Sequence, residues 1–382
     1  MRSVHPEKIS RRRTLKVVDK EPIDNGRLLV QSGVGFEKCQ KTYQVSRKWE
    51  LLMDFTELVE LTSERLGGAV LYANDDFFAS KDNLLKSSKP IFVEDKYTDR
   101  GKWMDGWESR RRRTPGFDWC IVRLGLPGRV RGVMVDTSFF RGNYPEQCSL
   151  EACAIDGNPS IEDLLGESTS WTEILPVSGL NGDSLNPFPI NHENRITHLR
   201  FKIYPDGGVA RLRVYGEVIP DRRRLMRENI DLASVENGAR IIDCSDKFFG
   251  HPLNLIMPGR SANMSEGWET RRRRGPGHDW VVIQLAGRSQ IDSVEIDTSH
   301  FKGNYPDTCT LEVIDSISND SAPGDVEWRS LLARSKLQAH TRHQFQDELE
   351  SANPATHVRL NIYPDGGVSR LRILGRLVED KQ

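Results

Sequence analysis

Two arginine-rich segments hold the residue types best suited to chemistry. Residues 106–113 read Gly-Trp-Glu-Ser followed by four arginines, and residues 267–274 read Gly-Trp-Glu-Thr followed by four more. An arginine guanidinium can form two parallel hydrogen bonds to a carboxylate. The glutamate before each run can act as a general base or accept hydrogen bonds from N–H groups. The pattern favours a site for a small carboxylic acid, although a salt-bridged surface explains any single arginine equally well.

Side-chain direction divides each arginine run into two pairs. In an extended segment, successive side chains point to opposite sides. Arg110 and Arg112 are therefore expected on one side, and Arg111 and Arg113 on the other. One pair can then face a pocket while the other faces solvent or carboxylates.

Two histidines mark the second half of the chain. His278 and His300 stand where matching motifs of the first half have Phe117 and Phe139. Histidine is the side chain best able to move protons near neutral pH, so both are candidates for proton transfer, with a structural role as the alternative. Polar residues that lie close to them in the sequence are Asp279, Asp297, Lys302 and Asn304. For Asp297, the end of a strand or a turn is the alternative role.

The elements that must position these residues also occur twice. Pro-Gly-x-Asp-Trp, Asp-Thr-Ser, Gly-Asn-Tyr-Pro and Ile-Tyr-Pro-Asp-Gly-Gly-Val each appear once in either half, in the same order. About ten extra residues lie in the first copy near 86–102, where a loop tolerates them. Repeats of this length indicate a duplicated domain. We predict a polar arm at 1–45, a first repeat at 46–222 and a second repeat at 223–382.

Strand patterns dominate each repeat. Residues 119–124 and 280–285 are short apolar runs with β-branched residues, and residues 130–136 alternate between apolar and polar positions. Pro-Asp-Gly-Gly supplies a turn, and no long amphipathic helix competes with the strands. We predict an all-β protein with two tandem jelly-roll β-sandwich domains.

Composition excludes several classes of protein. The 382 residues include 54 Lys plus Arg and 55 Asp plus Glu, which gives a formal net charge of −1. The chain therefore has no excess of positive charge that would attract it to nucleic acid or a membrane surface. No apolar run is long enough to span a bilayer. Ser10–Lys16 resembles a twin-arginine export signal, but no apolar stretch follows it, and export is not expected.

Common cofactor and metal motifs are absent from the sequence. There is no P-loop, dinucleotide fingerprint, GxSxG or HExxH, and the six cysteines show no CxxC spacing. His340 and His343 form an HxxH pair without a third ligand nearby, so we predict neither a metal nor a cofactor.

The doubled motifs resemble those of the allantoicase family. Gly-Trp-Glu-[Ser/Thr]-Arg-Arg, Gly-x-Asp-Trp, Asp-Thr-Ser-x-Phe-[Arg/Lys]-Gly-Asn and Ile-Tyr-Pro-Asp-Gly-Gly carry the resemblance, which runs from about Phe55 to Leu377. It implies galactose-binding-like jelly rolls in a cytoplasmic homo-oligomeric enzyme of purine (allantoin) catabolism. The expected reaction is allantoate plus water to ureidoglycolate plus urea. Asn186 stands where the second copy has His343, so a site that uses this imidazole is expected only in the second copy.

The chemistry of that reaction suggests roles for residues of the second repeat. Allantoate carries a carboxylate and two ureido groups on one carbon, and the leaving urea must be protonated before water adds. As a hypothesis, the carboxylate is bound by Arg271 with Arg273 or Arg274, and the proton moves through His300 or His278. Glu269 and Asp297 orient the substrate or act as the base, and the other predicted substrate contacts are Trp268, Lys302 and Asn304. The alternative is a non-catalytic tandem module that binds a sugar or a small acid.

Overall fold

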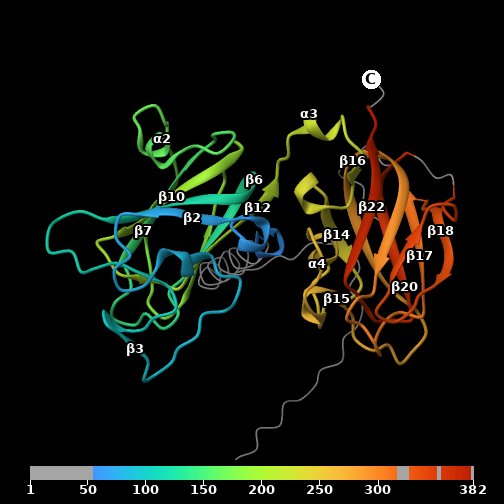
Figure 1. Cartoon of the computed structure of the whole chain (residues 1–382), viewed down its shortest axis with the longest axis horizontal. Helices are drawn as coiled ribbons and strands as arrows, with labels where there is room; N and C mark the ends of the chain where they lie inside the picture. Colours follow the sequence, from blue (N-terminus) through green and yellow to red (C-terminus); the bar gives the residue numbers. More distant parts are fainter. Residues whose placement is uncertain (1–54, 316–326, 351–353, 380–382) are drawn as a thin grey trace, which may run out of the picture. The chain divides into compact units, whose positions relative to one another are not determined.

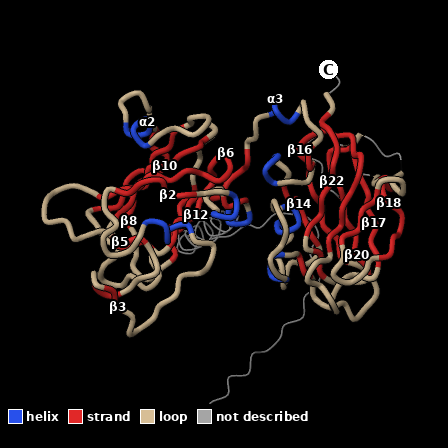
Figure 2. The backbone as a smooth tube through the Cα atoms, in the orientation of Figure 1, coloured by secondary structure: helices blue, strands red, loops and turns tan. Residues whose placement is uncertain are grey.

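The computed structural model describes residues 55–315, 327–350 and 354–379 (Figure 1). The predicted arm at 1–45 lies outside the described residues. Strands make up most of the regular structure of each repeat, and the helices are short (Figure 2). The α-helices of the described residues, α2 (Ile161–Leu165), α3 (Arg222–Leu225) and α4 (Leu253–Ile256), have one turn or little more. The all-β prediction is confirmed.

The two repeats have the same strand order. In the first, the order is β1-β12-β6-β10-β7-β8, with β2 and β9 also paired to β6; in the second it is β13-β22-β16-β20-β17-β18, with β14 and β19 also paired to β16. The strands of the first repeat are β1 (Val59–Glu60), β2 (Ala69–Ala73), β6 (Asp118–Asp136), β7 (Gln147–Cys153), β8 (Thr172–Gly179), β9 (Leu185–Pro189), β10 (Ile196–Tyr204) and β12 (Arg211–Val218). Those of the second are β13 (Ile230–Asp231), β14 (Arg240–Cys244), β16 (Asp279–Asp297), β17 (Thr308–Ile314), β18 (Arg329–Lys336), β19 (Arg342–Phe345), β20 (Ala355–Tyr363) and β22 (Arg370–Leu377).

One long strand in each repeat belongs to both layers of the sandwich. The first half of β6 pairs antiparallel with β2 and β10, and its second half pairs with β9 and β12. In the second repeat, β16 divides its partners in the same way among β14, β20, β19 and β22. A strand that changes sheets in this manner makes the corner of a β-sandwich. The tandem jelly-roll architecture follows from this repeated topology.

A buried tryptophan positions the glutamate of each arginine-rich segment. Trp268 is fully buried, and its Nε1 donates to the carbonyl of Asp246 at 2.8 Å. Because side chains alternate along a strand, Glu269 then points away from this core, and the short strand β15 (Trp268–Glu269) pairs with β21 (Gly367–Val368). A Cβ on Gly367 would lie 1.9 Å from the ring of Phe301, so only glycine lets β21 approach. Trp107 holds Glu108 in the same way, with β5 (Trp107–Glu108) paired to β11 (Gly208–Val209).

The repeats differ most in the insertion that the sequence placed near 86–102. It forms a small hairpin in which β3 (Tyr97–Thr98) pairs with β4 (Gly101–Lys102). In place of the hairpin, the second repeat has a shorter connection at 259–266, which contains the 3-10 turn Met264–Glu266. This hairpin therefore changes the surroundings of Glu108 but not those of Glu269.

Candidate functional site

Carboxylates hold alternate arginines of the run in the second repeat. The Nε of Arg271 lies 3.0 Å from Oδ2 of Asp246, and the backbone N–H of Arg271 donates to Oδ1 of the same carboxylate. The guanidinium of Arg273 pairs with buried Asp279, and its backbone N–H donates to Asp365 at 2.7 Å. Both side chains are thus committed to holding the segment, as the alternation predicts for one pair of each run.

The intervening arginines are free to bind a ligand. Arg272 and Arg274 are exposed, and neither has an ion pair or hydrogen bond within the described residues. The first repeat shows the same division, because Arg110 pairs with Asp75 and Arg112 pairs with Asp118. The hypothesis assigned the substrate carboxylate to the two paired arginines or to Arg274. The structure instead makes Arg272 available, a residue that the hypothesis omitted although the alternation pointed to it.

A cavity of about 680 Å³ opens beside Glu269 in the second repeat. It collects three of the predicted site residues, namely Glu269, Arg273 and Asn304. Its lining is Phe249, Glu269, Thr270, Arg272, Arg273, Gly303, Asn304, Tyr305, Asp307, Pro364, Asp365 and Gly366. The Nδ2 of Asn304 donates to Oε1 of Glu269 at 2.5 Å, which fixes the carboxylate at the cavity wall. A guanidinium, a carboxylate and an amide therefore face one space large enough for a small molecule.

Other predicted residues lie outside this lining. Trp268 belongs to the core, and Arg271 is held by Asp246. Asp297 is buried at the end of β16, where it accepts the N–H of Ser299 at 2.7 Å and so has the strand-end role named as its alternative. Arg274 and Lys302 are exposed.

His278 lies close to the rim of the cavity. Its ring centroid is 4.6 Å from that of Tyr363, the residue before Pro364, and its Nε2 is 3.3 Å from Oδ1 of Asn361. This contact with the sheet surface agrees with a positioning role for the imidazole.

His300 lies on a loop whose backbone is fixed from a neighbouring loop. It has a φ of 70°, and its N–H donates to Nδ1 of His340 at 2.7 Å. Its Nε2 donates to the carbonyl of Ser261 at 2.9 Å. Phe139, at the same position of the first repeat, also has a φ of 70° and donates its N–H to Asp183. The left-handed backbone is thus independent of whether the side chain is imidazole or phenyl.

The histidines of the HxxH pair hold loops in place through hydrogen bonds to the backbone. His343 accepts the N–H of Gln338 through Nε2 at 2.9 Å and donates from Nδ1 to the carbonyl of Ile296 at 3.1 Å. In the first repeat, Asn186 accepts the N–H of Asn181 and donates to the carbonyl of Val135. The exchange of histidine for asparagine therefore preserves both hydrogen bonds. Within the described residues, no group of three or more His, Cys, Asp or Glu side chains could hold a metal ion.

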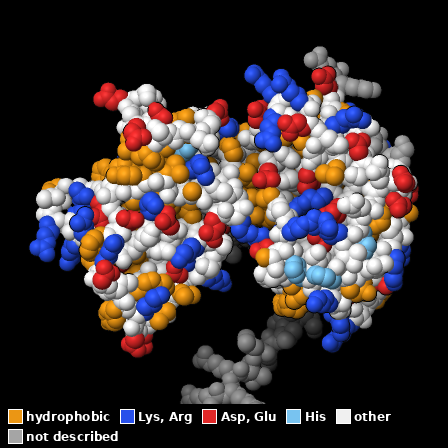
Figure 3. Space-filling view, viewed as in Figure 1, with side chains coloured by type: hydrophobic (Ala, Val, Ile, Leu, Met, Phe, Trp, Pro, Cys, Tyr) orange, Lys and Arg blue, Asp and Glu red, His pale blue; other side chains and the backbone are white. Residues whose placement is uncertain are grey.

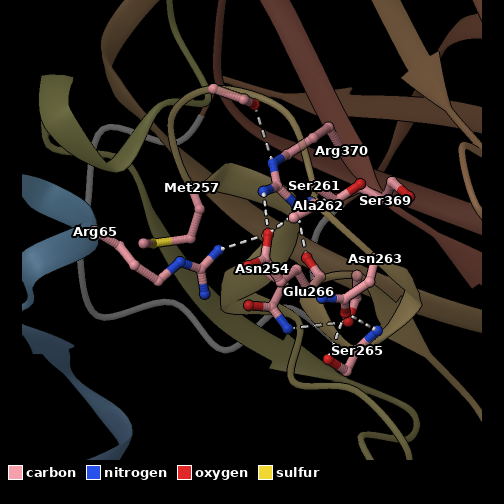
Figure 4. Close-up of polar contacts among 12 residues, drawn as sticks. Arg65, Asn254, Met257, Ser261, Ala262, Asn263, Ser265, Glu266, Ser369 and Arg370 are labelled. Carbon is pink, nitrogen blue, oxygen red and sulfur yellow. Dashed lines mark hydrogen bonds and ion pairs between the residues drawn. The ribbon is translucent and has the colours of Figure 1, made fainter. Parts of the chain in front are cut away.

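The loop that accepts a hydrogen bond from His300, through the carbonyl of Ser261, is held by a buried arginine (Figure 4). Arg370, at the start of β22, donates to the carbonyl of Glu266 at 2.7 Å and to that of Gly259 at 3.2 Å. Burial lowers the pKa of Arg370 to about 10, because the charged guanidinium loses contact with water. These bonds fix both ends of the loop that carries Ser261, and thereby the acceptor for the His300 imidazole.

Comparison with known proteins adds to this geometry. The family model described as allantoicase repeat matches residues 59–219 and 230–378. The chain is 48% identical over 333 residues to the allantoicase of Dictyostelium discoideum, covering 85% of this chain and 89% of the relative. It is 46% identical over 328 residues to a probable allantoicase of Pseudomonas fluorescens, covering 85% and 97% respectively. The crystal structure of allantoicase from Saccharomyces cerevisiae is similar with a TM-score of 0.71 and 35% identity, covering 86% of this chain and 98% of that one.

The distribution of charge and the character of the helices are two further features of the described residues. Basic and acidic side chains are interspersed over both repeats on the face shown in Figure 3. Among the helices of the described residues, none has the length and apolar character needed to cross a bilayer.

A substitution of Asp246 tests whether its ion pair with Arg271 stabilises the protein. Burial raises the pKa of this carboxyl, but the N–H groups of Phe248 and Arg271 and the Arg271 guanidinium outweigh burial, and the net pKa is lowered. The stability from its ionisation is therefore present above its unfolded pKa, near 4, and is lost as pH falls through the folded pKa. We expect Asp246→Asn to cost about 1–2 kcal/mol at pH 7, allowing for solvent at the exposed arginine.

The measurement is thermal unfolding of both proteins from pH 7 to pH 3. The difference in Tm should shrink below about pH 4, where wild type also loses the charge. Asp243→Asn is the matched control, because Asp243 is exposed and accepts only the N–H of Cys244. A difference in Tm that stays constant over the whole pH range would contradict a stabilising ion pair between Asp246 and Arg271.

Proposed function

The chain belongs to the allantoicase family, and we propose that the cavity beside Glu269 is the place where it hydrolyses allantoate. The enzyme converts allantoate and water to ureidoglycolate and urea, a hydrolysis in allantoin degradation. The observation that carries the site is the position of Arg272, an unpaired guanidinium in the same cavity as the Glu269–Asn304 pair.

The substrate matches this arrangement group by group. Its carboxylate pairs with Arg272, because a guanidinium binds a carboxylate through two parallel hydrogen bonds. The ureido N–H groups donate to Glu269, and the second N–H of the Asn304 amide exchanges its weak contact with Sδ of Met264, at 3.5 Å, for a ureido carbonyl. Arg273 contributes its position and its charge, since Asp279 already occupies its guanidinium.

Bond cleavage requires a proton for the leaving urea and a base for the attacking water. As the ureido nitrogen is protonated, its bond to the central carbon breaks, and the carbon is left with imine-like character. Water then adds at this carbon and transfers its proton to Glu269. We assign proton delivery to His300, because its Nε2 is occupied by Ser261 while Nδ1 stays available to carry the proton.

The position of His300 is supported by the first repeat. There Phe139 and Arg141 line a cavity together with Glu108 and Asn143. His300 and Lys302 occupy the same two positions of the second repeat, outside the lining of the cavity beside Glu269. His278, against Tyr363, is assigned to positioning.

We also propose, from the family resemblance, that the enzyme is a homo-oligomer and acts in the cytoplasm. Light scattering on the purified full chain would measure its mass, and a single-chain mass of 43.5 kDa at micromolar concentration would contradict the oligomer.

Glu269→Gln tests the base. The amide keeps the shape, and its oxygen still accepts the N–H of Asn304, but it cannot act as a base. We expect kcat for urea release from allantoate to fall by about 10²–10⁴-fold. An unchanged kcat in a variant with the wild-type Tm would remove Glu269 from the mechanism.

Arg272→Gln tests the carboxylate contact against a control in the same run. Loss of hydrogen bonds to a charged group costs about 1.5–3 kcal/mol, which corresponds to an increase in KM of about ten- to a hundredfold. Arg274→Gln removes an equally exposed charge outside the cavity and should leave KM near the wild-type value. Equal effects of the two substitutions would indicate a general charge effect in place of a specific contact.

The two histidine assignments can be separated by substitutions that the first repeat already contains. His300→Phe and His278→Phe install the residues found at Phe139 and Phe117, so the backbone accepts both. We expect kcat to fall about 10²–10⁴-fold for His300→Phe and less than about tenfold for His278→Phe. The acidic or basic limb that disappears from the pH profile of His300→Phe would identify the proton step; a larger loss for His278→Phe would reverse the assignment.

A further inference from the structure

The first repeat contains a cavity of its own beside the equivalent glutamate. Its volume is about 350 Å³, and its lining is Phe78, Phe92, Gly101, Lys102, Met104, Glu108, Phe139, Arg141, Gly142 and Asn143. We propose that this cavity is a second binding site, which holds a small carboxylic acid bearing a ureido or carbamoyl group without cleaving it. The class of ligand rests on the function proposed for the second repeat; the existence of the site rests on the first repeat alone.

The polar centre of this cavity repeats that of the second repeat. The Nδ2 of Asn143 donates to Oε1 of Glu108 at 2.7 Å, which leaves Oε2 of Glu108 without another partner in the described part of the chain. The aligned carboxylate can accept N–H groups of a ligand. Burial raises the pKa of Glu108, and the hydrogen bond from Asn143 opposes that shift. A carboxylate this poorly hydrated benefits from N–H donors supplied by a ligand.

The inserted hairpin builds the wall that faces this centre. Phe92 and Lys102 both come from the segment that the second repeat lacks. The ring of Phe92 stacks with that of Phe139, with a centroid separation of 5.7 Å and an interplanar angle of 22°. The two stacked rings give this side of the cavity an apolar wall. The insertion therefore completes a cavity, which a simple surface loop would not do.

Two cations complete the match to an acid. The Nζ of Lys102 lies 4.6 Å from the Phe92 centroid and has no carboxylate partner within the described residues. Arg141 is oriented by Asp183, whose Oδ2 lies 3.1 Å from its Nε, so its remaining N–H groups stay available. Neutralising a bound carboxylate thus requires no rearrangement of existing ion pairs in this cavity.

The same comparison shows why this site should bind without hydrolysing. Phe139 takes the position of His300, so the proton carrier is missing. Arg111, the counterpart of Arg272, does not line this cavity. A ligand here would meet one carboxylate and two cations but no imidazole to carry a proton to a leaving urea.

Calorimetric titration of the full chain with N-carbamoylglycine tests the proposal. This acid carries one ureido group and lacks the second that the enzyme releases as urea. We expect wild type to bind two molecules per chain. Lys102→Ala, a substitution on an exposed hairpin, should weaken one of the two binding events by about tenfold or more and leave the other unchanged.

Two further variants distinguish this site from the proposed active site. Lys96→Ala is the matched control, because Lys96 lies on the same hairpin, stacks on Trp103 at 3.7 Å and does not line the cavity; it should bind two molecules. Arg272→Gln should weaken only the other binding event. A wild-type protein that binds a single molecule, lost in Arg272→Gln and retained in Lys102→Ala, overturns the second site and leaves the proposed function intact. A single molecule lost in Lys102→Ala alone supports the second site and counts against the assignment of Arg272.

Discussion

Pairing of alternate arginines with fixed carboxylates is the interaction on which the rest of the site depends. Four adjacent guanidinium groups repel one another, and an unpaired run of this kind would have no preferred conformation. Asp246 and Asp279 neutralise Arg271 and Arg273 and keep the segment extended. Arg272, between them, lines the cavity beside Glu269, and the buried Trp268 sets where the extended segment begins.

The sequence was a good guide to the fold for a specific reason. Duplication presents each strand pattern twice, and strands with short connections leave few arrangements other than a sandwich. Alternation within the arginine run also predicted which side chains share a side. The carboxylates Asp246 and Asp365 are distant from the run in sequence, so the sequence alone could not show which arginines donate hydrogen bonds to them: Asp246 binds Arg271, and Asp365 accepts the backbone N–H of Arg273. Arg272, which lines the cavity and has no ion pair within the described residues, was consequently left out of the predicted site.

The histidines show a second reason why residue types alone do not predict the roles of side chains. His340 and His343 have the spacing of a metal pair in the sequence, yet each makes hydrogen bonds that Asp183 and Asn186 make in the first repeat. Their roles emerge only from comparing contacts between the copies. The same comparison separates His300 from them, because nothing in the first repeat reproduces its imidazole. A non-catalytic module is not favoured as the whole account of the chain, since relatives 46–48% identical over 85% of its length are named as enzymes.

The left-handed residue at 139 and 300 has a consequence for how such a protein changes over generations. Its backbone is held by an acceptor on another loop, whether aspartate or histidine, so the side chain itself does not determine the backbone conformation. A phenyl and an imidazole have already been exchanged there with the main chain unmoved. After a duplication, a single substitution at such a position can change the reactivity of one copy, while the other copy stays as it is.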